Sequence, residues 1–321
     1  MAQNFERASP EALYDAAWAL AGRNFYARDR LNGWHYWQHR FDGMLRTYQD
    51  AYRAIGEMLS SLDDKYTFLK LPEVLEQDSQ VANSEESPVR VSFLRGGIGY
   101  IKLFTFGQQN AADAMRDALA SLDDARGIII DLRGNPGGFL RQANNMLSLF
   151  MSVGEVMVLR NCENGETTEE VGVLSPRGFE ATKYDSRGNV LNTFNWDRYP
   201  NLLGGRPIYV LIDETTCSAS ELFAATLRDN RIALLIGRTT SGKGIAQDSL
   251  PLPNGCALRC TNGIFLPPSR QWFGDDAQTV RNGVQPNVWI DQNRWHRHDC
   301  IFEEAVERMT CEFRTWRPRV A

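Results

Sequence analysis

The N-terminal part of the chain carries apolar residues at helical spacing. In the first helix they lie three or four positions apart: Leu13, Ala17, Leu20, Ala21 and Phe25. This run follows Ser9-Pro10, and proline is typical of a first helical turn. The same periodicity predicts helices over residues 34–44 and 49–62. We therefore expect a small N-terminal helical domain at residues 1–69.

The pattern changes after this domain. Residues 70–88 are mostly polar, which predicts a linker or loop. From residue 89 apolar and polar residues alternate with the period of a β-strand, and a second such run follows the glycine pair at 96–97. The two runs predict a strand and its hairpin partner at the start of a second domain, residues 89–321.

The second domain alternates short apolar runs with helical segments. Apart from Asp131, residues 127–131 and 207–212 are apolar, as in buried parallel strands, and helical patterns follow at 140–150 and 218–228. Strands that alternate with helices need crossover connections, so the sequence predicts an α/β fold with a mainly parallel sheet. Turn signals between β-prone runs predict a β insertion around residues 160–205.

Composition narrows the classes of function. The chain has 321 residues, of which 43% are hydrophobic and 23% are charged, as in globular proteins. Its net charge of -5 argues against nucleic acid as a partner, because phosphate binding needs concentrated positive charge. No apolar run could span a bilayer and no signal peptide is evident, so we expect a cytoplasmic protein with reduced cysteines. No motif indicates a cofactor, and the oligomeric state stays open.

The candidate chemistry lies in residues 215–247. Ser218 stands where an apolar strand turns into a helix, and Lys243 follows 25 positions later between two glycines. A serine hydroxyl is a weak nucleophile until a base takes its proton. The chain has only four histidines, all far from this stretch, whereas burial can lower the pKa of a lysine until it serves as the base. We therefore predict Ser218 as nucleophile and Lys243 as base, with the amide of Gln247 holding the amine in place.

An acyl-transfer site also needs donors for the oxyanion that forms on the substrate. The backbone N–H of Ala219, at the start of a helix, is one candidate. The glycine turn at residues 135–138 is the other, because glycines allow backbone N–H groups to face a substrate.

The motifs around Ser218 have other interpretations. Ser218-x-x-Glu221 is a capping box, and for that fragment alone a structural role is favoured. Residues 237–243 match the first seven positions of a phosphate-binding P-loop, but the eighth is Gly244 where Ser or Thr is needed, and no helix is predicted to follow. Cys217 is a rival nucleophile, although no histidine is evident to form its thiolate.

Two other pairs of residues suggest chemistry. His35 and His39 lie four positions apart on a predicted helix and could share a metal ion, although their aromatic neighbours favour packing. Cys256 and Cys260 share one face of a predicted strand, so we expect buried thiols.

Four motifs, taken in order, resemble the C-terminal processing peptidases, the tail-specific serine proteases of family S41. The motifs are Gly99–Phe106, Ile130–Gly138, Ser218–Glu221 and Gly242–Gln247. The interval between the serine and the lysine also matches that family. Residues 63–69 resemble the end of the family's N-terminal helical segment, and residues 283–286 resemble its closing motif. The resemblance covers about residues 13–290.

The resemblance implies a crotonase/ClpP-like α/β core with a Ser-Lys dyad. By motif, the implied site consists of Ser218 as nucleophile, Lys243 as general base, Gln247 as its orienter, and the backbone amides of Gly138 and Ala219 as oxyanion donors. Family members usually carry a PDZ domain before the Gly99 strand. Here about 30 residues separate Leu69 from Gly99, fewer than an independent domain needs, so we expect the PDZ domain to be absent. Asn287 replaces a usual Asp, and Cys217 a usual Ala, without removing a catalytic group.

Together these observations predict a serine endopeptidase. It would hydrolyse peptide bonds in a peptide or protein substrate through an acyl-enzyme. The alternative is a non-catalytic ligand-binding protein on the same fold, similar to retinoid-binding repeats. The intact Ser218, Lys243 and Gln247 argue against that alternative.

Overall fold

The N-terminal unit consists of short helices. The computed structural model describes residues 7–274, 282–292 and 298–315. The helices of this unit are α1 (Pro10–Asn24), the 3₁₀ turn η1 (Arg28–Leu31), α2 (His35–Gln38) and α3 (Tyr48–Ser60). As predicted, α1 begins at Ser9-Pro10, and the Ser9 side chain accepts a hydrogen bond from the N–H of Ala12 at 3.1 Å. A reciprocal cap between Thr47 and Asp50 begins α3.

The helix predicted over residues 34–44 is wrong in its length, because only the single turn of α2 is helical. The Tyr14 hydroxyl donates to the carbonyl of Trp37, which a continuing helix would use for the N–H of Phe41. Gly43 then adopts a φ of 70°, a value that a right-handed helix cannot contain. A tertiary hydrogen bond thus overrides the local periodicity.

The loop predicted at residues 70–88 is also wrong, because most of this segment is helix α4 (Pro72–Ala82). Pro72 occupies its first turn, and good helix formers such as Glu, Leu and Gln follow. None of its residues is buried. A helix that buries so little shows no strong apolar periodicity, so its polar composition resembled that of a loop.

The first sheet has six strands, and its strand order is β13-β10-β9-β4-β3-β2. The strands are β2 (Val89–Leu94), β3 (Ile98–Leu103), β4 (Gly127–Asp131), β9 (Ile208–Ile212), β10 (Leu234–Gly237) and β13 (Val288–Trp289). All neighbours pair parallel except β2 and β3. Every residue of β4 and β9 is buried, as predicted for strands of this kind.

The second sheet has seven strands, and every pair in it is antiparallel. The strands are β1 (Phe68–Lys70), β5 (Gly154–Glu163), β6 (Glu166–Ser175), β7 (Gly178–Tyr184), β8 (Val190–Trp196), β11 (Ile245–Pro251) and β12 (Ala257–Leu266). The strands expected around residues 160–205 are thus present and extend this sheet. The expectation of a mainly parallel sheet holds only for the six-stranded one, because short turns connect β5 to β8 as successive hairpins.

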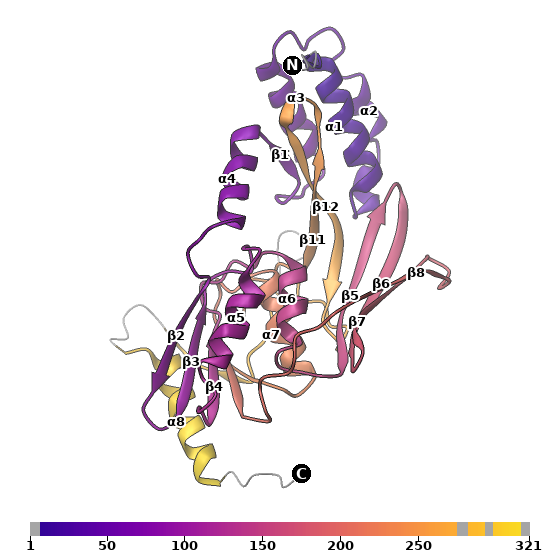
Figure 1. Cartoon of the computed structure of the whole chain (residues 1–321). Coiled ribbons are helices and arrows are strands. Elements are labelled where there is room, and N and C mark those ends of the chain that lie inside the picture. Colours follow the sequence, from indigo (N-terminus) through magenta and orange to yellow (C-terminus); the bar gives the residue numbers. More distant parts are fainter. Residues whose placement is uncertain (1–6, 275–281, 293–297, 316–321) are drawn as a thin grey trace, which may run out of the picture.

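Helices separate the two sheets and cover one of them from outside. Figure 1 shows α5 (Ala111–Ala120), α6 (Leu140–Leu147) and α7 (Ala219–Asp229) between the sheets, and their apolar side chains form the largest core with both. Helix α8 (Cys300–Thr315) covers the opposite face of the six-stranded sheet. The start of α7 therefore lies deep between two layers, where its position is well fixed.

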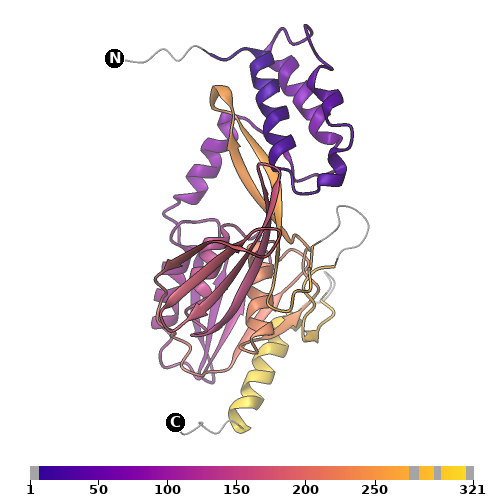
Figure 2. The same ribbon diagram turned by 90° about the vertical axis from the view of Figure 1, so that its right-hand side faces the viewer.

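The helical unit packs on the far ends of β11 and β12, which extend beyond the core and are joined by η2 (Pro253–Gly255) (Figures 1 and 2). Leu258 and Cys260 of β12 are buried in one apolar cluster with Leu13 of α1 and Ile55 of α3. Strand β11 thus has support from the helical unit at one end and from the core at the other. Across the described residues, no helix combines the length and apolar character needed to cross a membrane.

Candidate active site

Ser218 lies in a strained turn between β9 and α7. It is the residue before the first turn of α7 and has φ 58° and ψ -121°. Positive φ is uncommon for residues with a side chain, and such strain often occurs at functional sites. An ordinary capping serine has extended backbone angles, so this geometry exceeds what a helix cap requires.

The carboxylate of Glu221 holds this turn against the loop that carries Lys243. Glu221 is fully buried on α7, and its Oε2 accepts from the N–H of Ser218 at 2.7 Å and from the N–H of Lys243 at 2.8 Å. Its Oε1 accepts from the N–H of Gly242 at 2.6 Å and from the Thr240 hydroxyl. Four donors on one carboxylate compensate its burial, and they fix the two loops relative to each other.

The amine of Lys243 has the surroundings that its predicted role requires. Burial lowers the pKa of Lys243, and the nearby charge of Arg259 lowers it further, whereas Cys217, Asp64 and Glu221 act in the opposite direction. The amine lies 5.0 Å from the centre of the Tyr66 ring. The structure therefore bears out the expected direction of the shift and its cause.

Gln247 lies near this amine but is anchored elsewhere. Its side-chain N–H donates to the carbonyl of Tyr66 at 2.6 Å. Among the described residues no hydrogen bond joins Gln247 to Lys243, so its role as the orienter of the lysine stays a prediction. Sequence reasoning assigned no chemistry to Tyr66. Its place in the Asp-Asp-Lys-Tyr-Thr-Phe-Leu motif was the available signal.

The glycine turn after β4 packs directly against the serine turn. The carbonyl of Asn135 accepts from the N–H of Cys217 at 2.9 Å and from the Ser220 hydroxyl at 3.0 Å. A Cβ on Gly137 would lie 2.5 Å from the carbonyl oxygen of Cys217 and 2.8 Å from the nitrogen of Ala219. Only glycine fits there, which explains why two segments more than 80 positions apart form one site.

Gly138 and Ala219 present backbone N–H groups without an internal partner. Gly138 has φ 146° and pairs with Phe106 in a parallel bridge in which the neighbouring residues make the hydrogen bonds. Ala219 is the first residue of α7, where N–H groups have no acceptor within the helix. Within the described part of the chain neither group donates to a protein acceptor. Gly138 lines the cleft, whereas Ala219 is fully buried, and their role as oxyanion donors stays a prediction.

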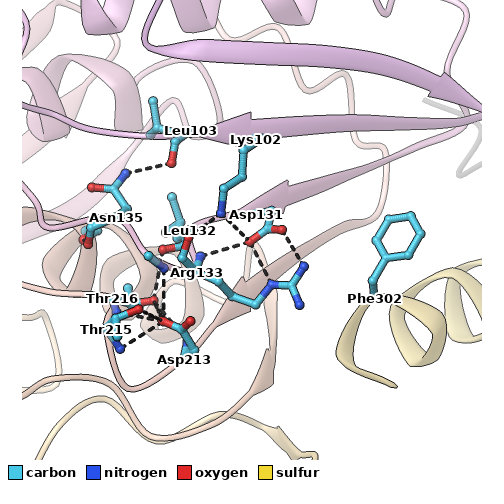
Figure 3. A network of polar contacts seen from close by, with 12 residues as sticks. Lys102, Leu103, Asp131, Leu132, Arg133, Asn135, Asp213, Thr215, Thr216 and Phe302 are labelled. Carbon is cyan, nitrogen blue, oxygen red and sulfur yellow. Dashed lines mark hydrogen bonds and ion pairs between the residues drawn. The ribbon is translucent and has the colours of Figure 1, made fainter. Parts of the chain in front are cut away.

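A polar network behind the glycine turn holds it in place (Figure 3). Asp213, after β9, accepts from the N–H of Gly134 at 3.2 Å and from the N–H of Thr216 at 2.9 Å. Beside it, Asp131 binds Arg133 at 2.7 Å and Lys102 at 3.1 Å. Burial alone would raise the pKa of Asp131, but these two cations hold it below its usual range. The network ties together the ends of β3, β4 and β9, and the glycine turn and the serine turn follow β4 and β9.

A cleft of about 730 Å³ is lined by all the predicted site residues except Ala219. Its lining includes Ser218, Lys243, Gln247 and Gly138 of the predicted site, the apolar side chains Phe139, Leu140, Leu159 and Phe265, and the polar side chains Lys70, Asp78, Asp248 and Arg259. The cleft runs between α4 on one side and β11 and β12 on the other. It can accept an extended chain next to the serine.

The other candidate residues lie in different settings. The chain after Lys243 forms strand β11, so the helix that a P-loop requires is absent from this stretch. Cys256 and Cys260 are buried free thiols, as expected, and burial raises the pKa of Cys260 to about 12. His39 pairs with Asp42 at the surface at 3.1 Å.

The chain is similar to known proteins in sequence and in fold. The sequence profile of "Peptidase family S41" matches residues 97–290. The chain is 30% identical over 204 residues to a carboxy-terminal-processing protease of Bartonella bacilliformis, covering 62% of this chain and 40% of that protein. It is 34% identical over 213 residues to carboxyl-terminal-processing peptidase 3, chloroplastic, of Arabidopsis thaliana, covering 66% of this chain and 34% of that protein. The chain thus spans two fifths or less of the length of these relatives.

Solved structures share the fold. The photosystem II D1 C-terminal processing protease superimposes with a TM-score of 0.63 at 18% identity, covering 88% of this chain and 94% of that one. A lipoprotein from Streptococcus agalactiae gives a TM-score of 0.67 at 14% identity, covering 97% of this chain and 99% of that one.

Proposed function

Because the chain belongs to peptidase family S41, we propose that it is a serine endopeptidase in which Ser218 attacks a peptide carbonyl and Lys243 accepts its proton. The observation that carries the proposal is the shared anchor of the two residues. Glu221 binds the backbone N–H of both, and both line one cleft. A nucleophile and its base need this fixed relationship, because a misplacement of about 1 Å can slow a reaction about a hundredfold.

The reaction would proceed in two halves. Ser218 Oγ forms a bond to the carbonyl carbon while Lys243 Nζ takes the hydroxyl proton, and the carbonyl oxygen becomes an oxyanion. The N–H groups of Gly138 and Ala219 stabilise that oxyanion, and the N-terminal end of α7 adds a favourable dipole. The lysine then gives its proton to the leaving amine. In the second half Lys243 takes a proton from water, which attacks the ester and releases Ser218.

The lowered pKa of Lys243 supports this role, because only the neutral amine can accept a proton. We propose that Gln247 orients the Lys243 amine indirectly, through Tyr66. Gln247 holds the Tyr66 carbonyl, and the Tyr66 ring faces the amine. The lysine is thereby positioned by neutral groups.

We further propose a crotonase/ClpP-like core, supported by the mainly parallel sheet whose β9 leads through Ser218 into α7. The substrate is a peptide or protein, and α4, which lines the cleft through Asp78 and Val81, guides it in place of a PDZ domain. A cytoplasmic location stays a prediction from the sequence.

Mass spectrometry of peptide mixtures tests the proposal. We expect the wild-type protein to produce new peptide termini and Ser218→Ala to produce none. Ser92→Ala, on the exposed face of β2, is the matched control and keeps full activity. A non-catalytic binder would leave every peptide intact in the wild type.

A further inference from the structure

Two cations line the cleft besides Lys243: Lys70, which pairs with Asp78, and Arg259 of β12. Arg259 is half-buried and lines the cleft that holds Ser218 and Lys243. It lies directly across from Ser249 of β11, and its guanidinium donates to the Ser249 hydroxyl at 3.2 Å. This neutral contact uses one of the five N–H donors of the guanidinium.

The carboxylates near Arg259 are already held by other residues. Asp78 of α4 pairs with Lys70, and Asp248 of β11 accepts from the side chain of Asn262 at 2.5 Å. Among the described residues no ion pair includes Arg259. Burial therefore lowers the pKa of Arg259, and the more distant Asp248 and Asp78 offset this only in part.

A half-buried guanidinium without a carboxylate partner is unusual, because charged groups removed from water are normally paired. Arg259 lines the cleft. Its planar fork of donors matches the two oxygens of a carboxylate. The missing partner is therefore supplied by whatever occupies the cleft.

The distance of Arg259 from Ser218 determines how far from the scissile bond the carboxylate of a substrate would lie. Along β11, Ser249 lies two residues beyond Gln247, which is about 7 Å at about 3.3 Å per strand residue. Within residues 7–274, 282–292 and 298–315, strand β11 pairs with β12 on one side only, so an extended peptide can run along its other side. A substrate whose scissile bond lies at Ser218 would bring a residue a few positions away to Arg259.

We propose that Arg259 is a specificity residue that binds a carboxylate of the peptide substrate, a few residues from the scissile bond. The carboxylate belongs either to an Asp or Glu side chain or to the chain terminus. This inference rests on the proposed peptidase function, but the binding that it describes can be measured without catalysis.

The test uses one peptide scaffold, taken from a peptide that the protein cleaves or binds, in matched acid and amide forms. In one arm Asp replaces Asn at each position on either side of the scissile bond. In the other arm the C-terminus is free or amidated at increasing distance. We expect one acid form to have a kcat/KM about tenfold or more above its amide form, because charge-assisted hydrogen bonds are strong. The arm that shows this preference identifies the source of the carboxylate.

Variants assign the preference to this residue. In Arg259→Gln the ratio of acid to amide should fall to about one, while cleavage of the amide form continues. Arg259→Lys keeps the charge without the fork and should retain part of the preference. The matched control is Arg160→Gln, which removes an exposed, ion-paired arginine on β5 outside the cleft and should leave the ratio unchanged.

Binding to Ser218→Ala separates the two proposals. The same peptide pairs, with a fluorescent label, are titrated into Ser218→Ala and into Ser218→Ala combined with Arg259→Gln. An acid preference that Arg259→Gln removes supports the subsite even if the wild type cleaves nothing, in which case the peptidase proposal alone fails. Equal affinity for both forms, or a preference that survives Arg259→Gln, overturns the subsite.

Discussion

The backbone N–H groups of Ser218 and Lys243 donate to the same atom, Glu221 Oε2, at 2.7 and 2.8 Å. The two residues come from different loops, and their shared acceptor is fully buried. A shift of either loop would leave a buried donor or acceptor without a partner, which is costly. The spacing of the proposed nucleophile and base therefore depends on a residue that need not touch substrate.

Glu221→Gln should weaken both folding and activity. One carboxylate oxygen becomes an NH₂ group that faces N–H donors, so the free energy of unfolding should fall by about 2 kcal/mol. We expect the rate of Ser218 acylation to fall by about tenfold or more, because the serine and lysine lose their fixed spacing. Urea unfolding and active-site labelling measure the two effects. Glu57→Gln, which affects only a surface pair with Arg40, is the control. Equal labelling rates in both variants would contradict the role of Glu221.

Gly137→Ala should disrupt the site more than a neighbouring substitution does. Its Cβ would lie 2.5 Å from the Cys217 carbonyl oxygen at a φ of 89°, so the serine turn must move. We expect the free energy of unfolding to fall by about 3 kcal/mol and the labelling of Ser218 to be lost. Gly134→Ala is the matched control, because it has a similar φ of 74° but open space around it. Gly134→Ala should lower the free energy of unfolding by about 1 kcal/mol and preserve the labelling of Ser218. Similar losses of labelling in the two variants would count against the close fit at Gly137.

Tyr66→Ala should shift the pH dependence of activity. Burial lowers the pKa of Lys243, and the Tyr66 ring is part of that cover. Activity needs the neutral amine, so it rises with pH through this lowered pKa. Removing the ring admits water, raises the pKa towards its ordinary value and moves the rise to higher pH. A pH profile of kcat/KM that keeps its midpoint would show that the ring does not shield the amine.

Lys243→Met should abolish activity without loss of stability at neutral pH. Its folded pKa is lowered, so the folded state resists protonation that the unfolded state accepts. Between the folded and unfolded pKa values the unfolded chain binds more protons, and the stability of the wild type rises with pH. The advantage of the Met variant should therefore be largest at about pH 7 and decrease towards about pH 10. Urea unfolding across this range would contradict the account if the advantage grew with pH.

The helical unit should stabilise the strands that border the cleft. Leu258 of β12 is fully buried in the apolar cluster that this strand forms with α1 and α3. Leu258→Ala should lower the free energy of unfolding by about 3 kcal/mol. Leu191 on β8 is 55% exposed, so Leu191→Ala should lower it by less than about 0.5 kcal/mol. Thermal unfolding compares the two, and equal costs would show that the unit packs loosely.

The sequence allowed much of the site to be predicted, because its features are local. Glycines at fixed positions mark the turn after β4, and the apolar run before Ser218 marks β9. Family resemblance then joined these segments across long distances. Features that depend on a distant partner could not be predicted. One such feature is the end of α2 at the Tyr14 hydroxyl. Helix α4 was missed for another reason, since none of its residues is buried and it shows no strong apolar periodicity.

Glu221 illustrates the same limit at the active site. Its spacing from Ser218 suggested a helix cap, and it does accept from the Ser218 N–H. The buried carboxylate of Glu221 also accepts hydrogen bonds from residues about 20 positions further along the chain, namely Thr240, Gly242 and Lys243. No periodicity records such a contact.

The measurement that tests the central claim most directly is fluorophosphonate labelling followed by intact-mass and peptide mass spectrometry. We predict a single adduct on Ser218 in the wild type, no adduct in Ser218→Ala, and much slower labelling in Lys243→Met, with all three proteins folded. A folded wild-type protein without an adduct, or with the adduct on Cys217, would contradict a Ser218–Lys243 dyad.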